Sequence, residues 1–147
     1  MILLTVLSGC ASNKEINAVT KGYDFTIKTE WNKQDVICDV ASDNNDYIFT
    51  IQQPERLKDM TVKYSGNSFK VSYLGMEYNC DNFSQDTHGV IEIVSEVLQK
   101  SHGTVVLDGK TEGTVNGIKY LLQVDDKGIP QELICSEIDL NIDFIKK

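Results

Sequence analysis

The side chains that could do chemistry are few in this sequence, and they are far apart. The two histidines, His88 and His102, fall at opposite ends of a segment with helical periodicity, where the rise of an α-helix separates them by about 21 Å. They therefore cannot share a catalytic or metal site. No serine stands in a Gly-x-Ser-x-Gly turn, and no His-Glu-x-x-His sequence occurs. We expect no enzymatic activity and no cofactor.

Three of the four cysteines, Cys38, Cys80 and Cys135, lie in or beside alternating segments typical of strands. They form no Cys-x-x-Cys pair, and no histidine stands at zinc-ligand spacing from them. We interpret them first as buried free thiols, because such a cysteine behaves as a small apolar side chain. One disulfide among the three, or a reactive thiol, is the alternative.

Two groups of carboxylates could collect a cation, Asp43 with Asp46 and Asp125 with Asp126. Neither group has the ligand spacing of a calcium-binding loop. Aspartate and asparagine in such clusters commonly bond their own backbone, so we interpret both groups as solvated turns. The sequence predicts no metal site.

The fourth cysteine, Cys10, follows an apolar run from Ile2 to Leu7 and two small residues. The segment Leu7-Ser8-Gly9-Cys10 resembles the lipobox of bacterial lipoproteins, in which the cysteine receives a diacylglycerol and becomes the new N-terminus. The resemblance implies that Cys10 is the lipidation site and that the rest of the chain is held on the extracytoplasmic face of the cell membrane. The run is much too short to span a membrane, so the lipid is the expected anchor.

The chain divides into a leader, a tether and one domain. Residues 1–9 carry no Lys or Arg and few apolar residues compared with a complete signal peptide, so we expect a truncated leader whose natural start lies upstream of Met1. Residues 10–22 lack apolar periodicity and are expected to form a flexible tether. Residues 23–147 are expected to form a single domain.

The composition is that of a globular protein with an acidic surface. The chain has 147 residues, 41% of them hydrophobic, and its 22 acidic and 14 basic side chains leave a net charge of −8. A chain of this length can bury a core. Its charge repels phosphate backbones and anionic lipid head groups, so we exclude nucleic acid as a partner and expect the domain to stand away from the membrane.

Most of the chain after residue 23 alternates between apolar and polar side chains, as half-buried strands do. Turn residues interrupt the alternation at 32–34, 42–46, 65–67, 116–117 and 125–128. We expect Gly75 to be a bulge or bend within one strand that continues to Tyr78. This gives about eight or nine antiparallel strands.

One segment has helical periodicity instead. Apolar residues from Phe83 to Leu98 fall on one stripe, and charged or polar residues lie opposite. We expect one helix over residues 84–100, capped by Asp81 or Ser84 and ended by Gly103. It falls between the fifth and sixth expected strands.

These elements predict an α+β fold, a curved antiparallel sheet wrapped on one main helix. Their order and the closing hairpin from Val124 to Pro130 resemble the lipoprotein-carrier (Lol-type) superfamily. The resemblance implies a half-barrel whose concave face holds an acyl chain or an apolar segment of a partner.

The expected sheet is too wide for one helix to cover. Eight strands span about 38 Å, whereas a helix is about 10–12 Å across, so either the sheet curls tightly or apolar surface stays open. We therefore expect a membrane-anchored protein that binds a lipid or another apolar ligand in the curved sheet. The alternative is a non-catalytic envelope scaffold or regulator that binds another protein, such as a cell-wall enzyme. The side chains expected to line the ligand site are Trp31, Phe49, Tyr73, Val94, Leu98 and Tyr120.

Overall fold

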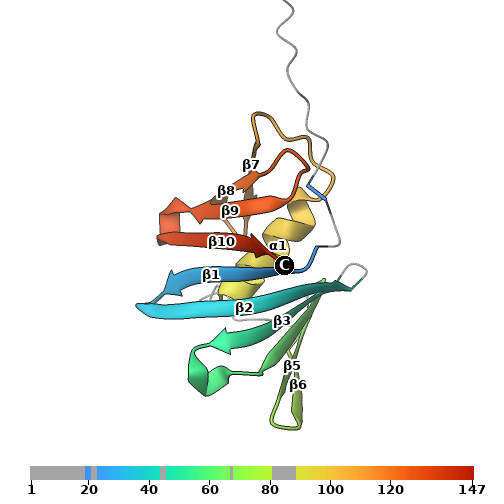
Figure 1. Ribbon diagram of the computed structural model, residues 1–147, viewed down its shortest axis with the longest axis vertical. Helices are drawn as coiled ribbons and strands as arrows, with labels where there is room; N and C mark the ends of the chain where they lie inside the picture. The colour runs from blue at the N-terminus through green and yellow to red at the C-terminus, as the bar shows by residue number, and fades with distance from the viewer. Residues whose placement is uncertain (1–18, 21–22, 44–45, 67, 81–88) are drawn as a thin grey trace, which may run out of the picture.

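A computed structural model describes residues 19–20, 23–43, 46–66, 68–80 and 89–147 of the chain (Figure 1). Within these ranges it has ten strands and one α-helix, so the predicted α+β class is confirmed. The strands are β1 (Phe25–Trp31), β2 (Gln34–Asp43), β3 (Asp46–Gln53), β4 (Thr61–Ser65), β5 (Ser68–Tyr73), β6 (Met76–Cys80), β7 (Lys110–Val115), β8 (Ile118–Val124), β9 (Pro130–Cys135) and β10 (Leu140–Lys146). The helix is α1 (Val90–Ser101), and two short 3-10 helices are η1 (Glu55–Leu57) and η2 (Ser136–Ile138).

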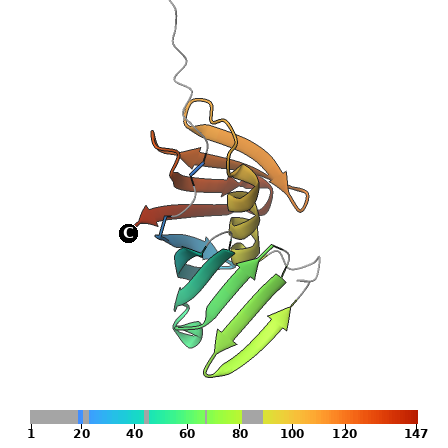
Figure 2. The ribbon, with the colours of Figure 1, turned by 90° about the vertical axis from the view of Figure 1, so that its right-hand side faces the viewer.

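The ten strands form one antiparallel sheet in the order β6-β5-β4-β3-β2-β1-β10-β9-β8-β7. The first strand, β1, pairs with β2 on one side and with the last strand, β10, on the other, where Ile27 lies opposite Phe144. The two edges of the sheet are therefore β6 and β7, which flank the helix in sequence. The sheet is curved and stays open (Figure 2).

The number of strands differs from the expected eight or nine for two reasons. Leu74 and Gly75 both have positive φ, 50° and 78°, and Tyr73 lies opposite Met76. These two residues are a tight hairpin turn between β5 and β6, so the expected bulge within one strand is wrong. The sequence also gave no alternating signal for β7, because Val115 is the strand's single buried residue.

The helix begins later than expected. Gly89 has an extended backbone, with φ −76° and ψ 150°, and no side chain caps the first turn. A continuous helix from residue 84 is therefore wrong, and the physical reason is that glycine is a poor residue for a helix interior. The expected caps, Asp81 and Ser84, lie outside the described residues. The expected end is confirmed, since the helix finishes at Ser101 and Gly103 follows with φ 76°.

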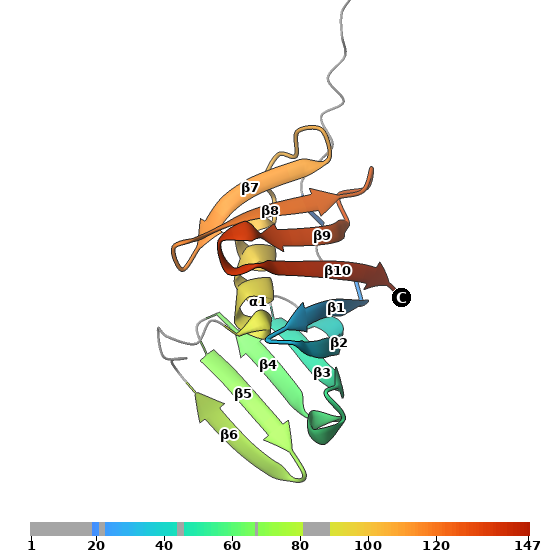
Figure 3. The same cartoon turned by 90° about the vertical axis from the view of Figure 1, so that its left-hand side faces the viewer.

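The helix lies on the inner side of the bend in the sheet, as Figures 2 and 3 show. Its buried apolar face joins one core cluster with the inward side chains of the strands, Ile27, Phe49, Leu122 and Leu133 among them. The buried hydroxyls of Ser95 and Ser101 donate to the helix carbonyls of Ile91 and Val97, so burying them leaves no donor unpaired. None of the helices in the described ranges has both the length and the apolar composition that crossing a membrane requires.

Candidate interaction surface

The groups that could do chemistry stay apart in the fold. In the part of the chain that the structure describes, no three His, Cys, Asp or Glu side chains are grouped so that they could hold a metal ion. The ring nitrogen Nδ1 of His102 lies 3.1 Å from the carbonyl oxygen of Val19, and His88 is outside the described residues. Asp125 accepts hydrogen bonds from the backbone N–H groups of Lys127 and Ile129, at 2.9 and 2.8 Å. This carboxylate organises the β8–β9 turn, as interpreted from the sequence.

The three described cysteines form no disulfide bond. Cys38 and Cys135 are buried, and Cys80 at the end of β6 is half-buried. Burial raises the pKa of the Cys38 thiol to about 12, with a smaller effect of the neighbouring Asp39, and raises the pKa of Cys135 to about 11. A thiol that stays protonated is a poor nucleophile. The interpretation of Cys38 and Cys135 as buried apolar side chains is confirmed.

Five of the six side chains expected to line a ligand site belong to the packed core or pack against it. Phe49, Val94 and Leu98 belong to the buried core between the sheet and α1. Tyr120 belongs to the same core cluster, and Trp31 lies half-buried at the end of β1, packed against it. Tyr73, on β5, donates its hydroxyl to the carbonyl of Arg56 at 2.8 Å.

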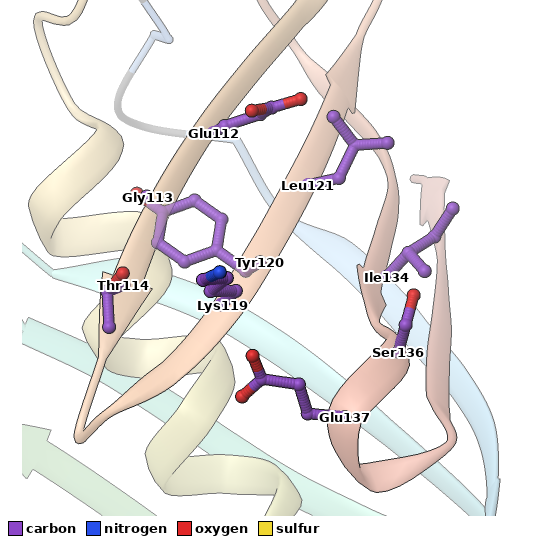
Figure 4. Close-up of a pocket in the computed structure, with 9 residues that line it drawn as sticks. All are labelled: Glu112, Gly113, Thr114, Lys119, Tyr120, Leu121, Ile134, Ser136 and Glu137. Atoms are coloured by element: carbon purple, nitrogen blue, oxygen red, sulfur yellow. The ribbon is translucent and has the colours of Figure 1, made fainter.

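The described recesses are open to solvent and are lined by both polar and apolar side chains. A recess of about 570 Å³ lies over β7, β8 and β9, with Glu112, Lys119 and Glu137 at its rim (Figure 4). Two others, of about 400 and 600 Å³, share Glu30 and Asn141 near the β1–β2 turn. None of the three is an enclosed apolar pocket.

The largest exposed apolar side chains gather at the β5–β6 hairpin. Leu74 is 80% exposed, Met76 67% and Tyr78 68%. Tyr73 lies opposite Met76 on the neighbouring strand. We call these four residues, Tyr73, Leu74, Met76 and Tyr78, the hairpin surface.

The hairpin surface continues the inner face of the sheet. Tyr78 lies opposite Val71, which lies opposite the buried Val62, so all three side chains are on the face that carries the core. Figure 3 shows β5 and β6 extending past the end of α1. The outer face of the same hairpin is polar, with Lys70 and Glu77 paired at 2.9 Å. The sheet is therefore wider than its helix, and this apolar end of it stays in contact with solvent.

The turn of this hairpin has an unusual residue. Two other turns with the same pair of positive φ angles have Asp108-Gly109 and Asn116-Gly117, which suit that backbone. The β5–β6 turn has Leu74 in the position of Asp108 and Asn116. A bulky residue with positive φ is strained, and such strain persists most often where the side chain has a function. Leu74 therefore costs the fold stability and places an apolar side chain at the tip of the hairpin.

The two edges of the sheet are protected differently. On β7, Lys110 and Glu112 are charged and exposed, and Lys100 of α1 donates to the carbonyl of Thr114 at 3.3 Å. On β6, Met76 and Tyr78 are the exposed large side chains, and Glu77 is the single charged residue. Charged side chains on an edge strand discourage pairing with other chains. β6 is the edge better suited to receive another strand.

Sequence reasoning included Tyr73 and missed Leu74, Met76 and Tyr78 as a surface. A usable signal was present, because Leu74-Gly75 separates two alternating segments by two residues, the spacing of a tight hairpin.

Comparisons of the chain with protein-family models, with curated proteins and with solved structures find no match.

Proposed function

We propose that this protein is a membrane-anchored lipoprotein on the extracytoplasmic face of the cell, whose domain binds another envelope protein through the hairpin surface. The partner supplies an extended segment that pairs with β6. The protein is a scaffold or regulator and performs no reaction of its own. The observation that carries this proposal is the exposure of Leu74, Met76 and Tyr78 on or beside β6, which, among the residues that the structure describes, pairs with a strand on one side only.

The anchor rests on the lipobox-like segment that ends in Cys10. A diacylglycerol there supplies two acyl chains, enough for stable attachment where one chain is marginal. The domain is then a half-barrel, with α1 filling the middle of its concave face. The end formed by β5 and β6 is left for a partner.

Strand addition fits the chemistry of β6. Alternate N–H and C=O groups of an edge strand point away from its neighbour, and a partner strand satisfies them with main-chain hydrogen bonds. Met76 and Tyr78 then contact the partner's side chains on the inner face, while Glu77 and Asn79 face it on the outer side. The partner segment should therefore alternate, with apolar side chains on one face and polar or basic ones on the other.

A lipid or other apolar ligand is the second candidate, and the same uncovered surface favours it. An acyl chain lying against Met76 and Tyr78 would extend the core cluster, against which Val71 and Cys80 of this hairpin already pack. The two candidates differ in what the purified protein carries. Native mass spectrometry of the domain showing a stoichiometric lipid would favour the ligand, and a lipid-free domain would favour the protein partner.

Cross-linking in the native host tests the protein partner. A photoreactive benzoylphenylalanine replaces Tyr78, and in a matched control it replaces Thr114 on the opposite edge, which is also exposed. We expect one dominant cross-linked protein from position 78, absent from position 114 and lost when Leu74→Asn is added. The purified pair should then show slower hydrogen exchange at the backbone amides of β6. Equal cross-linking from both edges, or unchanged exchange in β6, would count against strand addition.

A further inference from the structure

The chain enters the domain at a fixed point. Val19 is 2% exposed and forms a parallel bridge with His102, and its carbonyl oxygen accepts a hydrogen bond from the Gly103 N–H at 3.4 Å. Thr20 donates its backbone N–H to Gly128 and its hydroxyl to Lys127, at 3.1 and 3.0 Å. These contacts hold the incoming chain between the C-terminal end of α1 and the β8–β9 turn.

This entry point lies close to the anchor. Nine residue steps separate Cys10 from Val19, and a fully extended chain of that length spans about 30 Å. When the lipid holds Cys10 in the membrane, Val19 and the end of the domain around it must therefore lie within about 30 Å of the membrane surface. This step rests on the anchoring proposed above.

Two exposed aliphatic side chains lie at that same end. The loop of residues 103–109 connects α1 to β7, and in it Val105 and Leu107 are each 65% exposed while Val106 between them is fully buried. They are also well separated from the hairpin surface, which lies at the other end of the long axis (Figure 1).

The loop is ordered by its own hydrogen bonds. Leu107 and Lys110 exchange backbone hydrogen bonds of 3.2 and 3.0 Å around the turn at Asp108 and Gly109. The Gly109 carbonyl accepts a further bond from the Val124 N–H at 2.9 Å. Val105 and Leu107 are thus held outward on a rigid support, so contact with a membrane would cost little ordering of the backbone.

We infer that Val105 and Leu107 form a second membrane contact, inserting at the boundary between head groups and acyl chains of the bilayer that holds Cys10. The lipid on Cys10 keeps the loop near the surface, and the two side chains orient the domain. The hairpin surface then points away from the membrane, toward partners in the envelope. This revises the expectation that the acidic domain stands away from the bilayer.

The charges around the loop indicate which lipids it suits. The charged or titratable residues near it have both signs and are Asp108, Asp125, Asp126, Lys110, Lys127 and His102. They form no cationic patch, so attraction to anionic lipids is not what drives the contact. The contact is apolar, and zwitterionic phosphatidylcholine suffices for it.

Depth-dependent quenching tests the contact on the lipidated protein, purified from membranes and reconstituted in phosphatidylcholine vesicles with brominated acyl chains. The single natural tryptophan is removed by Trp31→Phe, and Leu107→Trp places one reporter in the loop. Met76→Trp places the control reporter at the opposite end. We expect bromine to quench the emission from position 107 by about half and to leave the emission from position 76 nearly unchanged. Adding Val105→Asp should largely abolish the quenching at position 107.

The outcomes separate this inference from the proposed function. A protein that does not float with the vesicles lacks the lipid on Cys10. This result would overturn both the proposed anchoring and the second membrane contact. A protein that floats and shows no quenching at position 107 overturns the second contact alone. Blue-shifted emission from position 107 without quenching would place the loop against a second copy of the chain. Quenching that occurs only when phosphatidylglycerol is present would indicate electrostatic attraction through Lys110 and Lys127 in place of apolar insertion. Either result also overturns the inference.

Discussion

The ring of Tyr120 lies against Gly113, its cross-strand neighbour on β7. A Cβ atom built on Gly113 would be 2.5 Å from the Tyr120 hydroxyl oxygen and 2.6 Å from the ring carbon that bears it. Figure 4 shows the ring beside Gly113. Glycine weakens a strand, and an aromatic ring that covers it from the next strand recovers part of that loss. Burial raises the pKa of Tyr120, as expected for a ring held in this position.

Gly113→Ala should therefore destabilise the domain by about 1–3 kcal/mol, because the added methyl group must displace the buried ring. Urea unfolding measures the loss. Thr114→Ala is the matched control on the same strand, and its exposed side chain should change the free energy of unfolding by less than about 0.5 kcal/mol. A neutral Gly113→Ala variant would show that the ring moves aside without cost.

Leu98→Ala tests whether the space between α1 and the sheet is packed. Leu98 is 4% exposed in the core cluster, so its truncation should cost about 2–5 kcal/mol in urea unfolding. Gln99→Ala, on the more exposed side of the same helix turn, is the control. A loss below about 2 kcal/mol together with increased binding of an apolar dye would instead favour an open ligand cavity at this site.

Leu74→Asn should raise stability and weaken partner binding at the same time. Asparagine tolerates the positive φ of this turn, so we expect a gain of about 0.5–1 kcal/mol in the free energy of unfolding. The cross-link from position 78 should fall because the apolar tip is lost. Met76→Ser is the comparison, since it should reduce the cross-link without a gain in stability. If Leu74→Asn destabilised the protein, the turn would not be strained by leucine.

The buried thiols predict loss of stability at alkaline pH. The folded pKa of Cys38, about 12, lies above its ordinary value of 9.0, so above about pH 9 the unfolded chain releases a proton that the folded chain keeps. The free energy of unfolding is unaffected by this thiol well below pH 9 and falls as the pH rises above it. The expected fall between pH 8 and pH 10 is about 1.4 kcal/mol for this thiol. Urea unfolding at the two pH values measures the fall, which Cys38→Ala should reduce by that amount. An unchanged pH dependence in the variant would show that Cys38 ionises in the folded state.

Local patterns were enough to predict most of the elements. The alternation of Phe25, Ile27, Val40 and Phe49 placed these residues on an inward face, and all four are buried. Gly103 ended the helix as expected. These predictions held because side-chain periodicity and the backbone freedom of glycine act between neighbours in the chain.

Other features depend on partners that are distant in sequence. The pairing of β1 with β10 joins Phe25 to Lys146, and no local signal selects that pair over others. Val19 was expected to belong to the tether, yet it is buried against the end of α1. Whether a strand edge is exposed, and whether a single valine is buried, depends on which elements lie beside it in the fold.

The sequence by itself determined the alternating strands, the position of the one long apolar helical stripe, the acidic charge and the lipobox-like segment that ends in Cys10. Only the tertiary structure decided where apolar residues remain exposed. Met76 and Tyr78 alternate as core residues do, and they are exposed because α1 does not extend over β6 (Figure 3). Val105 and Leu107 are exposed because Val106 takes the inward position between them. Burial depends on the relative size and placement of packed elements, which periodicity along the chain does not contain.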